Sequence, residues 1–395
     1  MALAYDAVIA TIVVASDATS VTKSMVKSTT WRQGTSGEWN STDCTLEAGK
    51  TYQFRTPKSG MSTATAAVLP NIKASVTVGW DTTASTTTSA GDNFLYCYAY
   101  NCTSLTSLSV PDTSGLTSVG DYFMGSYADG CTNLTSLSVP DTSGLTGVGT
   151  NFMYAYAYGC SSLTSLSAPN TSGLTSVGNY FMGSYAYNCS KLTSLSVPDT
   201  SGLTSVGGYF MASYADSCSS LTSLSVPDTS GLASVGYNFM SYYAEGCTSL
   251  KSLSVPDTSG LTSVRDYFMS YYAYNCSSLT SLILPDSTGW FGSHNVDWSV
   301  PSGRLGYLKG VVSTPSSETA WEGLIDEGET LYTNYIRSVD NVILGSADSE
   351  RGLYVHGKDT SSSERGLYVT GCYDQSSERS LYLKVASSDE SERIL

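Results

Sequence analysis

The sequence predicts a mainly β solenoid with short helices, built from rungs of 29 residues and flanked by β-rich segments. Cysteines recur every 29 residues, and prolines keep the same period without any insertion or deletion. A period between about 20 and 50 residues is typical of arrays in which each repeat is one supersecondary unit. The cysteines are Cys102, Cys131, Cys160, Cys189, Cys218, Cys247 and Cys276, and the prolines are Pro111, Pro140, Pro169, Pro198, Pro227, Pro256 and Pro285.

The first element of each rung is a short strand. The stretch LTSLSVP, residues 134–140, alternates apolar and polar residues and ends in proline, which is the pattern of a strand with one buried face. We expect the leucines and the valine to point inward and the serines outward. The tetrapeptide DTSG then predicts a turn, and LTGVG, residues 145–149, adds two inward residues.

The second element of each rung is predicted to be a short helix, as in residues 121–131. Its recurring residues are spaced i, i+1, i+4, i+5 and i+8, which places them on one helical face. They are Phe123, Met124, Tyr127, Ala128 and Cys131 in this rung. Asp121 and its equivalents Thr150 and Asn179 suit an N-cap, and the Gly, Asn or Ser before each cysteine suits a helix end.

The succession LTSLSVP, LTSVGDYF and YADGC resembles the BspA-type leucine-rich repeats of bacteria. The resemblance covers about residues 91–286, and the rungs are longer than the usual unit of that family at DTSG and around FMGS. It implies a leucine-rich-repeat solenoid with an extracellular, non-enzymatic surface or adhesion role.

Four domains are expected along the 395 residues. Residues 1–90 alternate in short runs and predict a β-rich domain that caps the solenoid of residues 91–286. The run AVIATIVVAS in this domain is interpreted as a strand and not as a signal peptide, since no basic residue precedes it. Residues 287–345 are expected to close the array. Residues 346–395 carry Ser-Glu-Arg every 14 residues, which predicts a β-array or a β-fibre shared between chains.

Composition limits the partners. The chain has a net charge of −15 with only 13% charged residues, so it should not bind nucleic acid. It contains no run of the ~18 apolar residues that a membrane helix needs, so no membrane insertion is expected. With two histidines and no CxxC motif, neither a metal nor another cofactor is predicted.

Two positions on the far side of the predicted helix vary from rung to rung. Where other rungs carry Gly, Ala, Ser, Asp or Glu, some carry tyrosine, which the fold does not require there. These residues form the candidate contact surface for a glycan or protein receptor, although they could also pack against a neighbouring domain or subunit. They are Tyr96, Tyr100, Tyr154, Tyr158, Tyr187 and Tyr274.

The cysteines and the aspartates that recur along the rungs could either stabilise the fold or take part in chemistry, as disulfides or as calcium ligands. The cysteines are expected to be buried free thiols, because seven in one column cannot all pair and stacked side chains rarely reach disulfide geometry; Cys44 and Cys372 lie outside the array, and a bridge from either stays open. The aspartates after each proline either bind calcium or satisfy the DTSG turn, and Asn170 in the same column favours the turn.

The predicted function is that of a non-enzymatic structural or adhesive protein on a cell surface or a virus-like appendage. It would bind a partner through the solenoid and assemble into a homo-oligomer, filament or fibre through its terminal strand edge. No phosphate-binding glycine loop or nucleophile motif is present. The alternative is a carbohydrate-active enzyme that uses paired carboxylates on a solenoid scaffold.

Overall fold

The structure is a computed structural model that describes residues 3–4, 7–26, 28–57, 67–81, 86–257, 260–262, 265, 267–269, 271–279, 281–283, 311–313, 367–371 and 381–385. Most of residues 284–395 therefore lie outside the described residues, including the predicted closing segment and most of the 14-residue repeats. The four predicted domain boundaries stay predictions.

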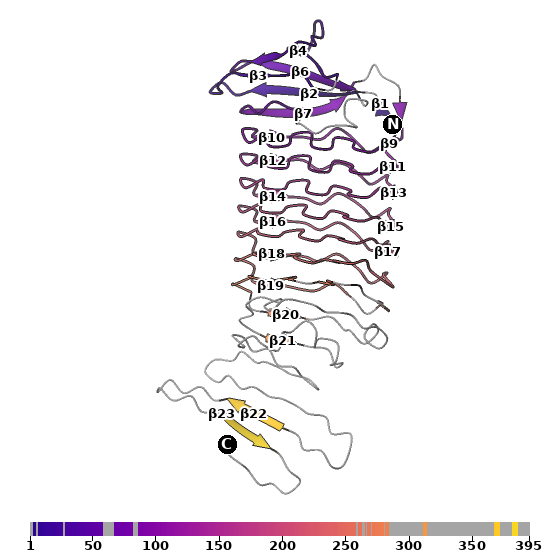
Figure 1. Ribbon diagram of the computed structural model, residues 1–395, viewed down its shortest axis with the longest axis vertical. Helices are drawn as coiled ribbons and strands as arrows, with labels where there is room; N and C mark the ends of the chain where they lie inside the picture. Colours follow the sequence, from indigo (N-terminus) through magenta and orange to yellow (C-terminus); the bar gives the residue numbers. More distant parts are fainter. Residues whose placement is uncertain are drawn as a thin grey trace.

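The N-terminal strands form one sheet with the first rungs of the array (Figure 1). Its order is β12 (Ser136–Leu137), β10 (Ser107–Leu108), β7 (Ala74–Trp80), β2 (Ala7–Val14), β6 (Thr51–Pro57) and β4 (Thr30–Gln33). Strand β2 pairs antiparallel with β6 and β7, whereas β7 pairs in parallel with β10. The predicted alternation is confirmed in β2, where Val8, Ala10 and Ile12 are fully buried. This sheet thus joins an antiparallel head to the parallel stack.

Two smaller antiparallel pairs complete the head. They are β3 (Val21–Lys23) with β5 (Cys44–Leu46), and β1 (Leu3–Ala4) with β8 (Thr86–Thr87). Two further strands near the C-terminus, β22 (Leu367–Gly371) and β23 (Leu381–Val385), also pair antiparallel, and each contains one leucine-tyrosine motif of the 14-residue repeat.

The rungs stack into a straight column in which each strand pairs with its counterpart 29 residues away (Figure 1). One column of strands continues from β10 and β12 through β14 (Ser165–Leu166), β16 (Ser194–Leu195), β18 (Ser223–Leu224), β19 (Ser252–Leu253), β20 (Ser281–Ile283) and β21 (Val311–Ser313). A second column holds β9 (Ser89–Ala90), β11 (Ser118–Val119), β13 (Gly147–Val148), β15 (Ser176–Val177) and β17 (Ser205–Val206). All the pairs between these strands are parallel, as predicted, with serines such as Ser165 exposed and leucines such as Leu166 buried.

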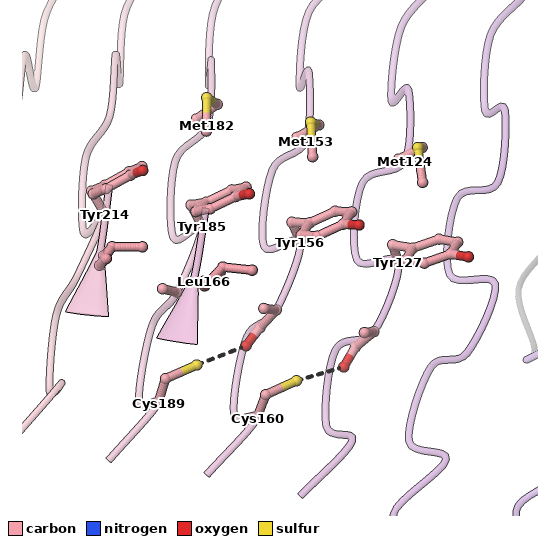
Figure 2. Close-up of a cluster of buried hydrophobic side chains, with 14 of the residues drawn as sticks. Met124, Tyr127, Met153, Tyr156, Cys160, Leu166, Met182, Tyr185, Cys189 and Tyr214 are labelled. Carbon is pink, nitrogen blue, oxygen red and sulfur yellow. Dashed lines mark hydrogen bonds between the residues drawn. The ribbon is translucent and has the colours of Figure 1, made fainter. Parts of the chain in front are cut away.

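The core consists of side-chain columns that run along the stack. Phenylalanine rings from Phe94 to Phe268 stack with centroids 5.4–5.6 Å apart, and buried tyrosines from Tyr98 to Tyr272 stack at 5.3–5.8 Å. Figure 2 shows the tyrosine and methionine columns beside the cysteines. Every member of the predicted inward set Phe123, Met124, Tyr127, Ala128 and Cys131 is fully buried.

The predicted short helices are wrong. Residues 121–131 and their equivalents form consecutive turns, and no helix occurs among the described residues. Packed helices need interaxial distances of about 8–10 Å. Neighbouring rungs are only 5.3–5.8 Å apart at both aromatic columns, so a helix in every rung would not fit. The result is a straight β-solenoid and not an arc with helices on its outer side.

The turn segment uses a backbone that is unusual for L-residues. In one rung Tyr122, Met124 and Ser126 have φ values of 57°, 50° and 48°, and the same alternate positions recur in the other rungs. Each left-handed residue costs about 1 kcal/mol. Hydrogen bonds between rungs offset this cost: Tyr122 N–H donates to the carbonyl of Thr150 at 2.9 Å, and Ser126 N–H donates to that of Tyr154 at 2.7 Å.

The predicted N-caps also have a different role. The carboxylate of Asp121 accepts a hydrogen bond from the backbone N–H of Thr150 in the next rung at 2.7 Å, and Asn179 accepts one from Gly208 at 2.8 Å. These side chains join rungs, because the segment that follows them is not a helix. The predicted helix-end residues do adopt positive φ, as at Gly130 with 75°.

Candidate binding face

The turn segments present a broad surface of tyrosines, and six of these tyrosines were predicted from the sequence. Among the six predicted residues, Tyr100 and Tyr158 are exposed by 40% and 36%. The other four, Tyr96, Tyr154, Tyr187 and Tyr274, are half-buried. The six tyrosines therefore reach the surface, although they do not lie on a helix, whereas smaller residues at the same positions, such as Ala212 and Ser241, are buried.

The structure adds tyrosines from three more positions of the rung. The residues with positive φ in a turn segment are counted here from its start. The first of these positions holds Tyr122, Tyr180, Tyr209 and Tyr267, and the third holds Tyr242 and Tyr271. Tyr237 lies just before the first position. These positions also vary between rungs, since Asn151 and Asn238 occupy the first and Ser126 and Ala155 the third. We call the six predicted and seven added residues together the tyrosine face.

The tyrosines of this face contact one another across rungs. Tyr180 and Tyr209 stack at 4.3 Å between ring centroids, and Tyr158 and Tyr187 stack at 4.5 Å. Tyr154 meets the edge of Tyr180 at 5.7 Å. Tyr158 lies four residues after Tyr154 in the same rung, so Tyr154 links the rung of one stack to a ring of the other. The face is thus continuous along the middle rungs.

Further pairs extend the face toward both ends of the array. Tyr96 meets Tyr122 at 5.2 Å near the first rung, and Tyr209 meets Tyr237 at 5.1 Å. Toward the last rung, Tyr242 stacks on Tyr271 at 4.8 Å.

Three carboxyl groups occupy the same column as Tyr158 and Tyr187. They are Asp129, Asp216 and Glu245, and sequence reasoning placed them at this variable position without assigning them a role. Desolvation raises the pKa of Asp129 and of Asp216 to about 6. Desolvation, together with the charge of Asp216 in the preceding rung, raises the pKa of Glu245 to about 7. These acids titrate well above ordinary surface carboxylates.

The cysteine column is structural, as predicted. All nine described cysteines are buried, and the seven of the 29-residue column are free thiols. The thiol of Cys160 donates to the carbonyl of Ala128 at 3.2 Å, and that of Cys189 donates to Ala157 at 3.1 Å (Figure 2). Desolvation raises the pKa of both thiols, so they stay protonated at neutral pH. Cys372 lies outside the described residues.

The aspartate column has the hydrogen bonds that the turn interpretation requires. Asp141 accepts bonds from the backbone N–H of Ser143 at 3.0 Å and from its hydroxyl at 2.7 Å. Asn170 makes the same two contacts with Ser172 at 3.1 and 2.8 Å. A neutral amide therefore serves as well as a carboxylate. No group of three or more potential metal ligands gathers in the part of the chain that the structure describes.

A stack of parallel rungs with leucines on the inward strand positions defines a leucine-rich-repeat solenoid. The profile of the BspA type leucine-rich repeat region matches the chain in 6 copies, over residues 93–239 and 211–295. These residues make up just over half of the chain, which therefore belongs to the BspA-type leucine-rich repeat family.

Other comparisons add little to this assignment. No curated protein matches the chain. Among solved structures, a leucine-rich repeat protein from Bacteroides ovatus is similar at 20% identity and a TM-score of 0.28. The alignment covers 53% of this chain and 55% of that one, so the chain matches about half of its relative's length. Within the described residues, a search for a helix suited to crossing a bilayer found none.

Proposed function

We propose that this protein is a non-enzymatic binding protein of a bacterial surface that holds a partner against the tyrosine face. The proposal rests on the presence of tyrosine at a position of the rung where other rungs have glycine. Tyr154 occupies a position where neighbouring rungs have Gly125 and Gly183, so the rung folds equally well without a side chain there. The ring of Tyr154 covers Gly183 of the next rung, where an added Cβ would lie 3.3 Å from it, but the rungs of Gly125 and Gly183 have this fold without a tyrosine at the position.

Tyrosine is well suited to contact surfaces, since it offers a large, stiff area with a polar tip. Five tyrosines of the face expose between 36% and 45% of their surface: Tyr100, Tyr122, Tyr158, Tyr237 and Tyr267. Such a gathering of exposed aromatic residues is typical of an interaction site. A surface location accords with the family, whose members are typically bacterial surface proteins.

The test replaces Tyr96, Tyr154 and Tyr158 by serine. Tyr96 lies in the first rung, and the other two lie at different positions of a later rung. We expect loss of attachment to cells and of binding to protein and glycan arrays, with the circular dichroism spectrum retained. A matched control replaces three exposed serines of the strand column, Ser136, Ser165 and Ser194, by alanine. The proposal fails if the tyrosine variant binds as well as the serine control.

Self-assembly through the C-terminal strands is a separate part of the proposal. Strands β22 and β23 of the 14-residue repeats pair antiparallel, and a strand of another copy would extend such a sheet. Deleting residues 377–395 should lower the mass measured by light scattering if these strands join copies. A full-length protein that is already monomeric would contradict this part alone.

In the enzymatic alternative, the paired carboxylates of the described residues could be Asp216 and Glu245, whose charges interact from adjacent rungs. Two carboxyl groups about 5 Å apart are the requirement for a retaining glycosidase. Release of reducing sugar from polysaccharides, abolished by Asp216→Asn, would favour this alternative over the binding function.

A further inference from the structure

The tyrosine face carries negative charge and almost no positive charge. In the turn segments, residues 91–102, 120–131, 149–160, 178–189, 207–218, 236–247 and 265–276, the acids are Asp92, Asp121, Asp129, Asp216, Glu245 and Asp266. The sole basic residue in these segments is Arg265, in the last rung. The chain as a whole has a net charge of −15. A partner that approaches this face therefore meets a field that favours cations.

Three of these acids lie among the tyrosines themselves. Asp216 is only 6% exposed, and its carboxylate accepts a hydrogen bond from the hydroxyl of Ser217 at 2.8 Å. Its charge raises the pKa of Tyr187 and, after the larger effect of desolvation, that of Tyr242. Desolvation and, to a smaller extent, the charge of Asp129 raise the pKa values of Tyr96 and Tyr158. Asp129 and Glu245 are half-buried and reach the aromatic surface, whereas Asp216 lies beneath it.

The groups that face these acids are phenols, thiols and other acids. Those interacting with Asp129, Asp216 or Glu245 are Tyr96, Tyr158, Tyr187, Tyr242, Ser126, Ser217, Cys131, Cys160, Cys218, Cys247 and Cys276. No lysine, arginine or histidine interacts with the three acids in the described part of the chain. No basic side chain of the described residues therefore neutralises the three acids, and the half-buried Asp129 and Glu245 can be reached by a partner.

The stacking of the rings argues against a sugar as that partner. In the pairs Tyr158–Tyr187, Tyr180–Tyr209 and Tyr242–Tyr271, one ring face of each member is turned to the other ring. The stacked faces are closed to a pyranose ring, which leaves a sugar only the opposite faces. Carboxylates and phenolic oxygens remain as acceptors for ammonium and guanidinium groups. The long stems of lysine and arginine can also pack along aromatic rings.

We propose that the tyrosine face binds a lysine- and arginine-rich segment of a protein partner, with its cationic groups seated at Glu245 and Asp129 and with Asp216 adding its charge from beneath the surface. This inference rests on the proposed function and adds the chemistry of the partner to it. The positions of the three acids along one column suit an extended segment that runs parallel to the solenoid axis. Such a segment would place basic side chains at the rungs ending in Cys131 and Cys247.

The test uses the full chain with oligo-arginine and oligo-lysine peptides as probes, and oligo-glutamate as the negative probe. The variant Asp216→Asn with Glu245→Gln removes two charges from the face at nearly constant shape. The control Asp199→Asn with Asp228→Asn removes two charges from the turn column, where Asn170 shows that the amide is accepted. We expect the face variant to weaken the binding of the basic peptides at least about tenfold and the control less than about twofold.

The pH dependence gives a second readout. Lowering the pH from 8 to 5 protonates Glu245, with its pKa of about 7, and then Asp129 and Asp216, with theirs of about 6. The affinity for the basic peptides should fall in this range, in which ordinary carboxylates stay ionised. The face variant should show a much flatter pH profile. Equal weakening in both double variants, or no binding of the basic peptides at all, would overturn the inference.

The two proposals can fail separately. If the basic peptides do not bind, but the variant Tyr96→Ser, Tyr154→Ser and Tyr158→Ser still loses cell or array binding, the partner is not cationic and the binding function stands. If that variant keeps all binding, the binding function itself is wrong. Retention of glycan binding by the face variant, together with its loss in the tyrosine variant, would identify a sugar as the partner and reject the cationic one.

Discussion

The phenolic hydroxyl of Tyr185 donates a hydrogen bond to the backbone carbonyl of Ser167 at 2.6 Å. The same contact recurs in the other buried tyrosines from Tyr127 to Tyr272, each with the residue 18 positions earlier. Tyr98, the first of the column, is fully buried, and its hydroxyl has no hydrogen-bond partner among the described residues. Tyr98 can therefore serve as a control for the other buried tyrosines, since it has the same burial without the hydrogen bond.

We predict opposite effects for the same substitution at these two positions. Tyr185→Phe leaves the carbonyl of Ser167 without its donor and should lower the free energy of unfolding by about 1–2 kcal/mol. Tyr98→Phe removes a buried unpaired hydroxyl and should be neutral or stabilising. Urea unfolding of the two variants measures the difference. Equal losses would mean that the hydrogen bond contributes nothing beyond ring packing.

The glycine that begins the turn segment in all rungs but that of Arg265 allows the rungs to approach closely. A Cβ at Gly149 would lie 2.4 Å from a carboxylate oxygen of Asp121 and 2.5 Å from its backbone nitrogen. Gly149→Ala should therefore destabilise the protein by about 1–3 kcal/mol. Gly147 has nothing within 4 Å of a Cβ and stands where other rungs carry Ser118, Ser176 and Ser205. Gly147→Ser should thus leave the melting temperature unchanged or raise it; a loss as large as that of Gly149→Ala would show that crowding is not the cause.

The sequence predicted the columns of the stack but not the backbone between them. Phe123, Tyr127 and Cys131 are buried as expected, because a strict 29-residue period places equivalent residues in one column whatever their local conformation. Their spacing of four residues suits a helix, but it also suits the alternating left-handed and right-handed backbone that the structure has. The distance between rungs decides between the two, and that distance is set by packing along the whole array.

The candidate face was predicted in part for a similar reason. Tyr154 and Tyr158 were found because their columns vary between rungs, and Tyr180 and Tyr209 belong to a column that also varies, between tyrosine and asparagine. If the segment were a helix, only two variable positions of each rung would lie on its outer side, and only these two were predicted as contact positions. In the observed backbone a third, a fourth and a fifth position come to the same surface, where Tyr154 contacts Tyr180.

The buried thiols should be unreactive in the folded protein. Desolvation raises the pKa of Cys102 and of Cys189 to about 12, and the thiolate is the form that alkylating agents attack. We therefore expect iodoacetamide to modify the cysteines from Cys102 to Cys276 only after denaturation. Mass spectrometry of peptides before and after unfolding gives the extent at each site. Rapid alkylation of Cys160 under native conditions would contradict the buried column.

Stability should rise as the pH falls from 8 to 5, in contrast to proteins whose carboxylates are held ionised by partners. The pKa values of Asp216 and Glu245 are raised on folding, to about 6 and about 7, so the native state binds protons more tightly than the unfolded chain. Their stabilising contribution is complete below the unfolded values near 4 and is lost as the pH rises through 6 and 7. We expect the melting temperature of the wild type to be higher at pH 5 than at pH 8. Asp216→Asn with Glu245→Gln should raise the melting temperature at pH 8 and flatten this dependence, whereas Asp199→Asn with Asp228→Asn should leave the dependence in place. A wild-type melting temperature that increases from pH 5 to pH 8 would show that these carboxyl groups are ionised at little cost in the fold.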